Sequence, residues 1–289
     1  MKPIKILEKD DPLFPIKLKE IRPKVKRLYI EGNERILNNF GIAIIGSRNS
    51  SKEGEKITEE IVTKLVKKDI IIISGLAKGI DSKAHQACIN SGGKTIAVIG
   101  SGFNNIYPKE NKKMYKKIIE TGGTIVSEYS PDTPVDSRNF PKRNRIVSGL
   151  SEGVVMIEGK YRSGTTITAQ YALNQNKKVF CLPHSISNSY GIGPNSIIQK
   201  GGILITKADD IIKEFQKDGI KFKEKEIKKK YKSDILKLLS KEILTKEELS
   251  IKTNKSISEV NQELTILELE GIITEEYRER IQNNWIIKY

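Results

Sequence analysis

The sequence predicts an α/β protein whose core is a doubly wound, mostly parallel β-sheet. Short apolar segments alternate along the chain with segments in which apolar residues recur at helical spacing. The apolar segments are apolar throughout, which is typical of parallel strands that are buried on both faces. Turns rich in glycine and serine follow several of these segments. Because ligands in such folds bind outside the carboxyl ends of the strands, we expect a binding site at that edge of the sheet.

The first forty residues are expected to form an N-terminal arm that packs on the main domain. Four prolines, at positions 3, 12, 15 and 23, exclude a long helix in this part of the chain. Residues 28–30, with the sequence Leu-Tyr-Ile, are expected to form a short strand.

Residues 41–217 are expected to form the main domain, in which strands and helices alternate. Strands are expected at residues 42–45, 70–73, 95–99, 124–126, 154–157, 178–182 and 203–205. Helices are expected at residues 53–68, 80–89, 109–120, 141–150, 166–175, 195–200 and 208–215. This order of elements is typical of a doubly wound sheet with helices on both faces.

The remaining residues differ from the main domain in composition. The stretch 221–232 holds seven lysines and two glutamates, and we expect residues 218–232 to form a basic linker. Beyond it, residues 235–239, 247–251 and 256–270 are expected to be helical, and residues 272–273 and 285–287 to form a hairpin. Three helices and a hairpin outline a winged helix-turn-helix, which we expect over residues 233–289.

The net charge of +15 is unevenly distributed along the chain. Residues 221–232 carry +5 and residues 233–289 carry −3, which leaves +13 on residues 1–220. A strongly basic domain predicts a polyanionic partner, and the mildly acidic C-terminal domain predicts a partner of another kind.

Several classes of protein are excluded by composition. No apolar segment approaches the length of a membrane span, and the N-terminus lacks the apolar core of a signal peptide. Cys88 and Cys181 form no metal-type spacing with each other or with the two histidines, and both are expected to be reduced core residues. We therefore expect a cytoplasmic protein with no metal, no cofactor and no membrane contact.

Two small-residue turns offer groups that bind phosphate. Gly46-Ser47-Arg48 follows the strand expected at 42–45, and it combines close backbone approach, a hydroxyl donor and a guanidinium fork. Ser163-Gly164-Thr165 precedes an expected helix, whose first N–H groups favour anions. Lys142, Arg143 and Arg145 precede the strand between these turns and are expected to reach the same edge. The alternative for these residues alone is a turn beside solvated surface charges.

No set of residues predicts catalysis. His85 lies four residues after Asp81 on an expected helix, and without further ligands nearby we expect a structural, hydrogen-bonded pair. His184 lies alone in an expected loop and is assigned no role. Because no Ser/His/Asp or Cys/His order indicates a nucleophile, the chain is not expected to be an enzyme.

Six motifs occur in the order that is found in one known family. They are AIIGSR at 43–48, SGLAKGIDSKAH at 74–85, TIAVIGSG at 95–102, FPKRNRIVSGLS at 140–151, SGTTITA at 163–169 and GPNSIIQKGG at 193–202. With these motifs the chain closely resembles the DNA-processing protein A family (DprA, also called Smf) over roughly residues 12–215. The resemblance implies an extended Rossmann-like domain that binds single-stranded DNA and forms homodimers. It also implies a recombination mediator that protects incoming DNA and loads the RecA recombinase in natural transformation.

Carried over by position, the resemblance implies a set of DNA-contacting residues. They are Gly46, Ser47, Arg48, Ser74, Gly75, Lys78, Lys142, Arg143, Asn144, Arg145, Ser163, Gly164 and Thr165. Two features depart from the family pattern. The helical domain that many members carry at the N-terminus is absent, and Leu182-Pro183-His184 stands where Val-Pro-Gly is usual.

Binding to single strands also uses contacts with bases, which commonly stack on aromatic side chains. Aromatic residues make up only 6% of the chain, although Tyr107, Phe140 and Tyr161 lie beside the expected site. We therefore expect phosphate contacts to dominate and stacking to be secondary.

Two other functions remain open at this point. One is a nucleotide phosphoribohydrolase, an enzyme class that shares this fold and carries a G-G-x-G-T-x-x-E motif. Alignment on Gly164-Thr165 puts Thr168 at the glutamate position, whereas glycosidic cleavage requires a carboxylate. The other is a transcription regulator that reads DNA with helix 256–270. That helix carries Glu259, Glu263, Glu268 and Glu270, which repel a phosphate backbone.

Overall fold

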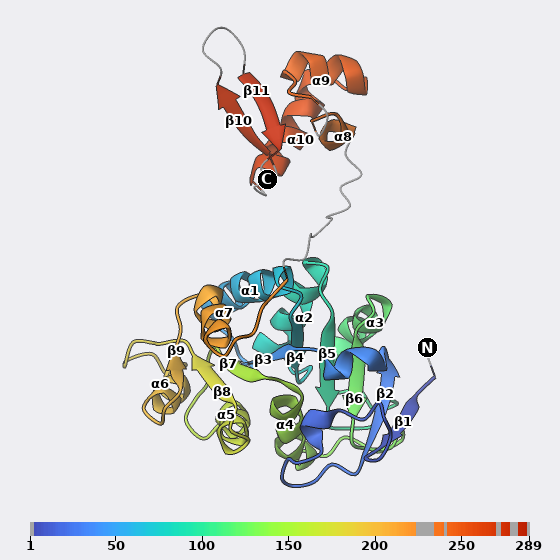
Figure 1. Cartoon of the computed structure of the whole chain (residues 1–289), viewed down its shortest axis with the longest axis vertical. Coiled ribbons are helices and arrows are strands. Elements are labelled where there is room, and N and C mark those ends of the chain that lie inside the picture. The colour runs from blue at the N-terminus through green and yellow to red at the C-terminus, as the bar shows by residue number, and fades with distance from the viewer. Residues whose placement is uncertain (1–2, 224–233, 240–241, 270–272, 278–282, 288–289) are drawn as a thin grey trace. The chain divides into compact units, whose positions relative to one another are not determined.

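A computed structural model describes residues 3–223, 234–239, 242–269, 273–277 and 283–287 of the chain. The chain forms two compact units, Met1–Ile227 and Lys228–Tyr289, which are drawn in Figure 1 and described here one after the other. In the part of the chain that the structure describes, no helix is both long and apolar enough to cross a membrane.

The large unit is built on a nine-stranded sheet with the order β1-β2-β6-β5-β4-β3-β7-β8-β9. The strands are β1 (Lys5–Glu8), β2 (Arg27–Gly32), β3 (Gly41–Ile45), β4 (Ile71–Ser74), β5 (Thr95–Ile99), β6 (Thr124–Ser127), β7 (Gly153–Met156), β8 (Lys178–Cys181) and β9 (Ile203–Leu204). Strands β3 to β9 run parallel, and β1 and β2 add an antiparallel edge beyond β6. The predicted fold class of an α/β protein with a mostly parallel sheet is confirmed.

Buried β-branched residues account for the central strands. All five residues of β3, Gly41–Ile45, are buried, and so are those of β4, β5, β6 and β7. Successive side chains point to opposite faces, so Ile42 and Ile44 enter one core while Ala43 and Ile45 enter the other. A strand that is apolar on both faces is stable only between two helical layers.

Helices cover both faces of the sheet, as Figure 1 shows. Those on one face are α1 (Lys52–Lys67), α2 (Ile80–Asn90), α3 (Lys112–Glu120) and α7 (Ala208–Lys217). Those on the other are α4 (Asn139–Leu150), α5 (Gly164–Asn174) and α6 (Ile192–Ile198). Short 3-10 turns are η1 (Ile16–Leu18), η2 (Glu34–Asn38) and η3 (Lys109–Asn111).

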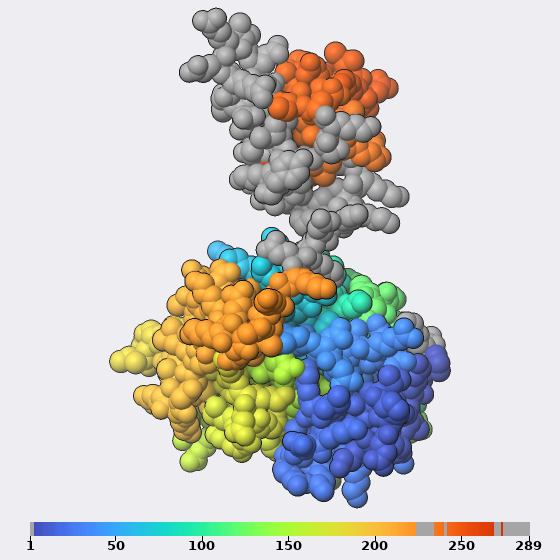
Figure 2. Space-filling view, in the orientation of Figure 1, coloured from blue at the N-terminus to red at the C-terminus, as the bar shows by residue number. Residues whose placement is uncertain are grey.

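The N-terminal residues pack on the same face as α4 and α5. Phe14, Leu18 and Leu28 are fully buried in the core that contains Ile146 and Val147 of α4. In Figure 2 the N-terminal segment, drawn in blue, forms part of the continuous surface of the large unit. Helix α4 is therefore enclosed between the sheet and the N-terminal residues. This position determines which of its basic side chains are buried and which are exposed.

Most predicted elements occur at the expected places, and the differences have physical reasons. The strand expected at 28–30 is the centre of β2, but β1 was not predicted because only Leu7 of its four residues is buried. The helix expected at 109–120 begins with the 3-10 turn η3 after Pro108. Helix α6 begins at Ile192, three residues early, because Pro194 is tolerated in a first turn.

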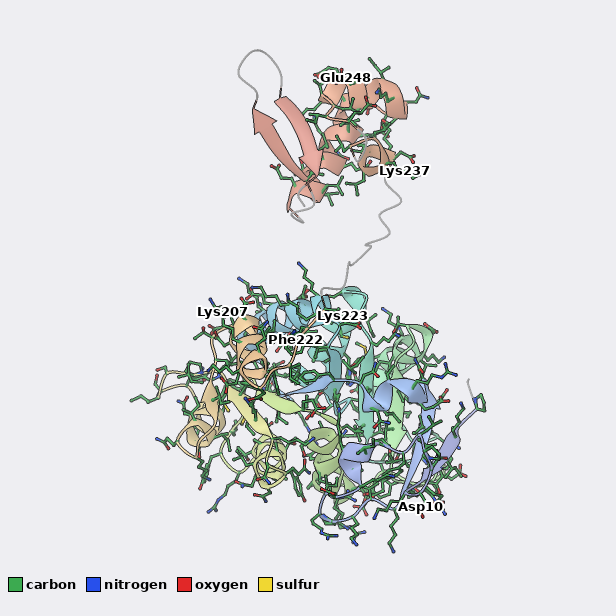
Figure 3. The ribbon with its side chains drawn as sticks, viewed as in Figure 1. Asp10, Lys207, Phe222, Lys223, Lys237 and Glu248 are labelled. Carbon is green, nitrogen blue, oxygen red and sulfur yellow. The ribbon has the colours of Figure 1, made fainter. Side chains whose placement is uncertain are left out.

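The packed part of the large unit continues beyond α7. The ring of Phe222, labelled in Figure 3, lies 5.1 Å from that of Phe40, which lies 5.0 Å from the ring of Phe215. Residues 218–223 of the predicted linker 218–232 are described, and residues 224–232 lie outside the described residues.

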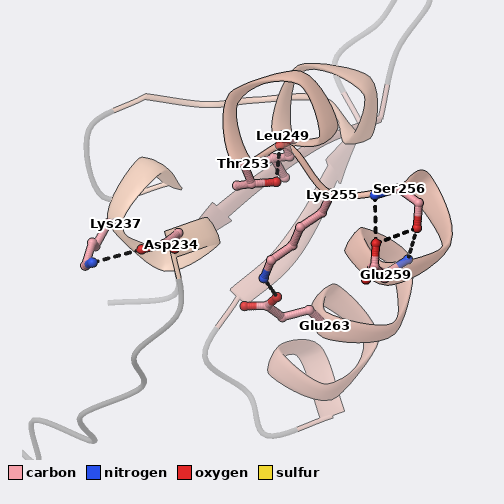
Figure 4. Close-up of polar contacts among 8 residues, drawn as sticks. All are labelled: Asp234, Lys237, Leu249, Thr253, Lys255, Ser256, Glu259 and Glu263. Atoms are coloured by element: carbon pink, nitrogen blue, oxygen red, sulfur yellow. Dashed lines mark hydrogen bonds and ion pairs between the residues drawn. The ribbon is translucent and has the colours of Figure 1, made fainter.

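The small unit contains α8 (Asp234–Leu239), α9 (Lys246–Thr253), α10 (Ile257–Leu269) and the antiparallel strands β10 (Ile273–Tyr277) and β11 (Asn283–Ile287). Its core includes Ile235, Leu249, Val260 and Leu264. Figure 4 shows the polar contacts that fix its helices: Lys255 forms an ion pair with Glu263 at 2.5 Å, and Glu259 accepts hydrogen bonds from Ser256. Glu270 and Ile272, which belong to the predicted helix and hairpin, lie outside the described residues.

Candidate functional site

The order of the strands places a topological switch point at the carboxyl ends of β3 and β7. From β3 the chain continues to β4, β5 and β6 in one direction, and later to β7, β8 and β9 in the other. The connections after β3 and β7 lead to α1 and α5, which lie on opposite faces of the sheet. Such a switch point is the usual ligand site of a doubly wound fold. We call the segments around it, residues 46–50, 75–79, 100–108, 139–144 and 158–165, the rim.

The turn Gly46-Ser47-Arg48 is held against the first turn of α2. The N–H group of Ile80 donates to the carbonyl of Ser47 at 3.2 Å. Gly79 permits this approach, because its φ is 73° and a Cβ atom there would lie 2.2 Å from the Ser47 carbonyl oxygen. The Ser47 hydroxyl donates to the carbonyl of Asn49 at 2.9 Å, whereas Arg48 is exposed.

Two hydrogen bonds tie the start of α5 to the other parts of the rim. The Thr165 hydroxyl donates to the carbonyl of Gly46 at 3.0 Å, and the Asn144 side chain donates to the carbonyl of Gly164 at 3.0 Å. Ser163 is the N-cap of α5, and its hydroxyl accepts from the N–H of Thr166. The predicted turns at 46–48 and 163–165 and the predicted Asn144 are therefore brought together.

The first turn of α4 presents an aromatic ring and a lysine at the rim. Pro141 is tolerated in this turn because the first N–H groups of a helix have no intrahelical partner. The centre of the Phe140 ring lies 5.4 Å from that of the Tyr107 ring and 5.6 Å from the Arg48 guanidinium. Tyr107 is 46% exposed, and Lys142 is also exposed. Among the described residues, neither Arg48 nor Lys142 has an ion-pair partner.

Arg143 does not share the exposure of Lys142. It is only 5% exposed, and its Nη1 group donates to the carbonyl oxygens of Gly75 and Val98 at the ends of β4 and β5. Gly75 leaves room for it, since a Cβ atom there would lie 2.6 Å from Arg143 Nη1. Burial lowers the pKa of Arg143 to about 10, against the favourable charge of Asp81, so the guanidinium remains charged at neutral pH.

Arg145 is buried on the opposite side of α4. It is 4% exposed, pairs with the Glu128 carboxylate at 2.6 Å, and donates to the carbonyl of Pro23 at 2.9 Å. The expectation that Arg143 and Arg145 directly contact phosphate does not fit this burial. The Nη1 group of Arg143 joins α4 to the sheet, and Arg145 joins α4 to the N-terminal residues and to Glu128.

Three further predicted residues have partners within the protein. The buried Ser74 hydroxyl donates to the carbonyl of Ile44 at 2.7 Å, and the N–H of buried Gly75 donates to Asp81 at 3.1 Å. Lys78 is exposed at the rim and forms an ion pair with Glu110 at 2.7 Å. Ser74 and Gly75 therefore shape the rim from below, while Lys78 can still meet a ligand from solvent.

The prediction that His85 forms a hydrogen bond with Asp81 is wrong, because each of them bonds with another residue. His85 Nδ1 lies 2.7 Å from the Thr95 hydroxyl, which itself donates to the carbonyl of Ile72, so His85 is the donor of this bond. Asp81 instead accepts from Gly75. Burial lowers the pKa of His85 to about 3, which keeps the ring neutral. The structural role that was expected for His85 is retained with a different neighbour.

The segment that departs from the family pattern is held by its histidine. His184 Nε2 donates to the carbonyl of Ile157 at 2.8 Å, and its backbone N–H donates to Asn195 at 3.1 Å. His184 thus ties the loop before α6 to the end of β7. Cys88 and Cys181 are buried, reduced core residues, as expected, and burial raises the pKa of Cys181 to about 12.

Comparison with known proteins gives one family. The sequence model of DNA recombination-mediator protein A matches residues 5–216. The chain belongs to this family. Protein Smf of Escherichia coli is 38% identical over 211 residues, which are 73% of this chain but only 56% of Smf. DNA processing protein DprA of Streptococcus pneumoniae is 40% identical over 206 residues, 71% of this chain and 72% of that protein.

Two solved structures of family members resemble the large unit. DprA from Streptococcus pneumoniae has a TM-score of 0.69 at 39% identity, and covers 73% of this chain and 74% of its own. DNA processing protein A from Helicobacter pylori, reported for its single-stranded DNA binding mode, has a TM-score of 0.67 at 29% identity. That match covers 75% of this chain and 97% of the Helicobacter chain.

Arg162 at the rim was missed by sequence reasoning. Its guanidinium lies 5.4 Å from the centre of the Tyr161 ring, and its φ is 54°. The signal in the sequence was a Tyr-Arg pair directly before the predicted turn at 163–165. The left-handed backbone that places the pair could not be predicted, because non-glycine residues rarely adopt it.

Proposed function

We propose that this member of the recombination-mediator family binds single-stranded DNA at the rim and acts as a recombination mediator in transformation. One observation carries the proposal: the half-buried Phe140 ring lies close to the exposed Arg48 guanidinium and the exposed Tyr107 ring, and the exposed Lys142 follows Phe140 by two residues at the start of α4. Aromatic rings accept stacked bases of any sequence, and free cations bind the phosphates between them. This combination suits a single strand better than a duplex, whose bases are already stacked.

The charge of the chain supports a polyanionic ligand. Residues 1–220 carry +13, and Arg48 and Lys142 lie among the small-residue turns of the rim. The N-terminus of α5 adds the positive end of a helix dipole beside Ser163 and Gly164. We propose Arg48, Lys142, Asn144, Ser163 and Gly164 as direct contacts, with Lys78 at the periphery. Arg143, Arg145, Ser74 and Gly75 then position these residues without touching the strand.

The alternative of glycosidic cleavage finds less support. The Thr168 hydroxyl, at the position of the phosphoribohydrolase glutamate, is buried and donates to the carbonyl of Gly164 at 3.0 Å. The carboxylate nearest in sequence to the end of β7 is Glu158, which is buried and accepts from the N–H and hydroxyl of Ser51 at the start of α1. A carboxylate engaged in this way caps a helix, so we favour a binding protein over an enzyme.

For the small unit we propose a winged-helix domain that contacts protein. Its helix α10 carries exposed Glu259 and Glu268, and Lys255 is paired with Glu263. This face is poorly suited to a DNA groove, which disfavours the transcription-regulator alternative. We further propose, from the family resemblance, a cytoplasmic homodimer that loads RecA.

The direct test is titration of the full chain with a single-stranded oligonucleotide and with its duplex at several salt concentrations. We expect single strands to bind at least tenfold more tightly than the duplex, and without preference for sequence. Equal affinity for the two forms would contradict the proposal. Release of free base from a nucleoside monophosphate would instead favour the enzyme.

A further inference from the structure

The turn between β7 and α5 carries an exposed pair of side chains at the rim that is not among the direct contacts proposed above. Tyr161 is 56% exposed, and Arg162 is exposed beside it. The Arg162 guanidinium lies over the Tyr161 ring at 5.4 Å from its centre. Within the described residues, Arg162 has no carboxylate partner. A large aromatic ring that stays exposed with a cation on one face has the composition of a nucleotide contact, not of a packed core.

Short links hold this pair at the same rim as Phe140. Arg162 directly precedes Ser163, the N-cap of α5, and lies two residues before Gly164, whose carbonyl accepts from Asn144. Asn144 lies one helical turn after Phe140 on α4. On the other side of the turn, the N–H of Gly159 donates to the carbonyl of Tyr190 at 2.8 Å. Both ends of the turn are therefore fixed, and the pair is linked to α4 through the N-terminus of α5.

The two pairs offer the same chemistry, and both are linked to the N-terminus of α5, which we propose to bind phosphate. Arg48 with Phe140 and Arg162 with Tyr161 each combine a ring face with a guanidinium. Ser163 and the first N–H groups of α5 lie between them along the connected segments. A single strand presents this alternation of bases and phosphates, and each base can stack whatever its sequence.

We propose that Tyr161 and Arg162 form a second nucleotide subsite, at which a base stacks on Tyr161 and the adjoining phosphate pairs with Arg162. The inference rests on the proposed function, because it continues the path of the strand that binds at Arg48 and Phe140. The subsite requires a strand long enough to pass the N-terminus of α5. It therefore contributes to the affinity for long oligonucleotides and not to that for the shortest ones.

The test compares Tyr161→Leu and Arg162→Gly with the unsubstituted full chain, using oligothymidylates of increasing length. Leucine keeps apolar bulk but has no ring face, and glycine suits the left-handed backbone of residue 162. Arg35→Ala is the matched control. Arg35 is exposed on η2, which precedes β3 and so lies at the amino end of that strand, whereas the rim lies at the carboxyl end. We expect each rim variant to lose at least tenfold in affinity for long strands and at most about twofold for the shortest strand that binds. The control should match the unsubstituted chain.

A second readout locates the contact. Strands that carry 5-iododeoxyuridine should cross-link to Tyr161 under near-ultraviolet light, and the modified peptide is identified by mass spectrometry. Unchanged long-strand affinity in both variants would overturn the subsite, and so would an equal loss for short and long strands. If the unsubstituted chain bound no single strand at all, the proposed function itself would fail. These outcomes are distinguishable.

Discussion

The basic side chains in and next to the rim include two groups, an inner and an outer layer, that differ in what they touch. The inner layer, Arg143 and Arg145, is buried, and it donates to backbone carbonyls and to Glu128. The outer layer, Arg48, Lys142 and Arg162, is exposed to solvent. Lys142 and Arg143 are sequence neighbours, yet they belong to different layers because α4 is enclosed between the sheet and the N-terminal residues. A basic cluster in a sequence can thus be partly a scaffold and partly a binding surface.

The largest expected effect is the loss of folding stability when an arginine of the inner layer is replaced. Arg143→Ala removes the partner of two buried carbonyls and the cation beside Asp81. Loss of one member of a buried charged network costs roughly 3–5 kcal/mol, so we expect the free energy of unfolding to fall by about that amount. Urea denaturation of the variant and of the unsubstituted chain measures it. A variant with unchanged stability and lost DNA affinity would move Arg143 into the outer layer.

Substitutions in the outer layer should lower DNA affinity and leave folding stability almost unchanged. In the double variant Arg48→Ala, Lys142→Ala, two charge-assisted phosphate contacts disappear, each worth roughly 1.5–3 kcal/mol when well made. We expect single-strand affinity to fall at least tenfold while the thermal midpoint shifts by no more than about 2 °C, because both side chains are exposed. Fluorescence anisotropy and a thermal scan give the two numbers. Unchanged affinity in the folded variant would remove the outer layer from the site, and Arg35→Ala serves as the control.

The buried side chain of His85 predicts that the stability of the protein depends on pH. Burial lowers the pKa of His85 from 6.5 to about 3. Because the folded pKa lies below the unfolded one, the stabilising contribution is complete above pH 6.5 and is lost as the pH falls from 6.5 towards 3. The slope from this group reaches about 1 kcal/mol per pH unit. His85→Asn cannot titrate, so urea midpoints measured at about pH 7 and about pH 5 should fall less in the variant. Equal falls in both proteins would argue against a buried neutral imidazole.

The smallest expected effect is the change in single-strand affinity when the small unit is removed. Residues 233–289 carry −3, so they should add little to the binding of a phosphate backbone. A chain that ends after Lys232 should keep nearly all of the single-strand affinity, and one that ends near Phe215 should keep most of it. Residues 233–289 alone should show no measurable DNA binding at physiological salt. Tight binding by that isolated piece would restore the transcription-regulator alternative.

Much of the fold could be predicted from the sequence because its strands are almost purely apolar. The segments around Ile42–Ile45 and Val154–Ile157 are stable in one environment, the centre of a sheet that is covered by helices on both faces. Strand β1 could not be predicted in this way. Its single buried residue, Leu7, leaves a pattern that an edge strand shares with a loop.

The site was less predictable than the fold. Small-residue turns at 46–48 and 163–165 were found because glycine, serine and threonine at strand ends have few other uses. Whether Arg143 points into the protein or out of it depends on the ends of β4 and β5, which are distant in sequence and supply the Gly75 and Val98 carbonyls that accept its hydrogen bonds. His85 was expected to bond with Asp81 four residues earlier, and its actual partner, Thr95, lies on the neighbouring strand β5.

The salt dependence of single-strand binding tests the division into two layers most directly. Each phosphate contact contributes about −0.7 to the slope of log affinity against log salt concentration, so three to five contacts give roughly −2 to −3.5. We predict that Arg48→Ala makes the slope shallower by about 0.7. Arg143→Met, measured under conditions in which it is folded, should leave the slope unchanged even where affinity falls. A slope that is altered by Arg143→Met and unaltered by Arg48→Ala would contradict the account.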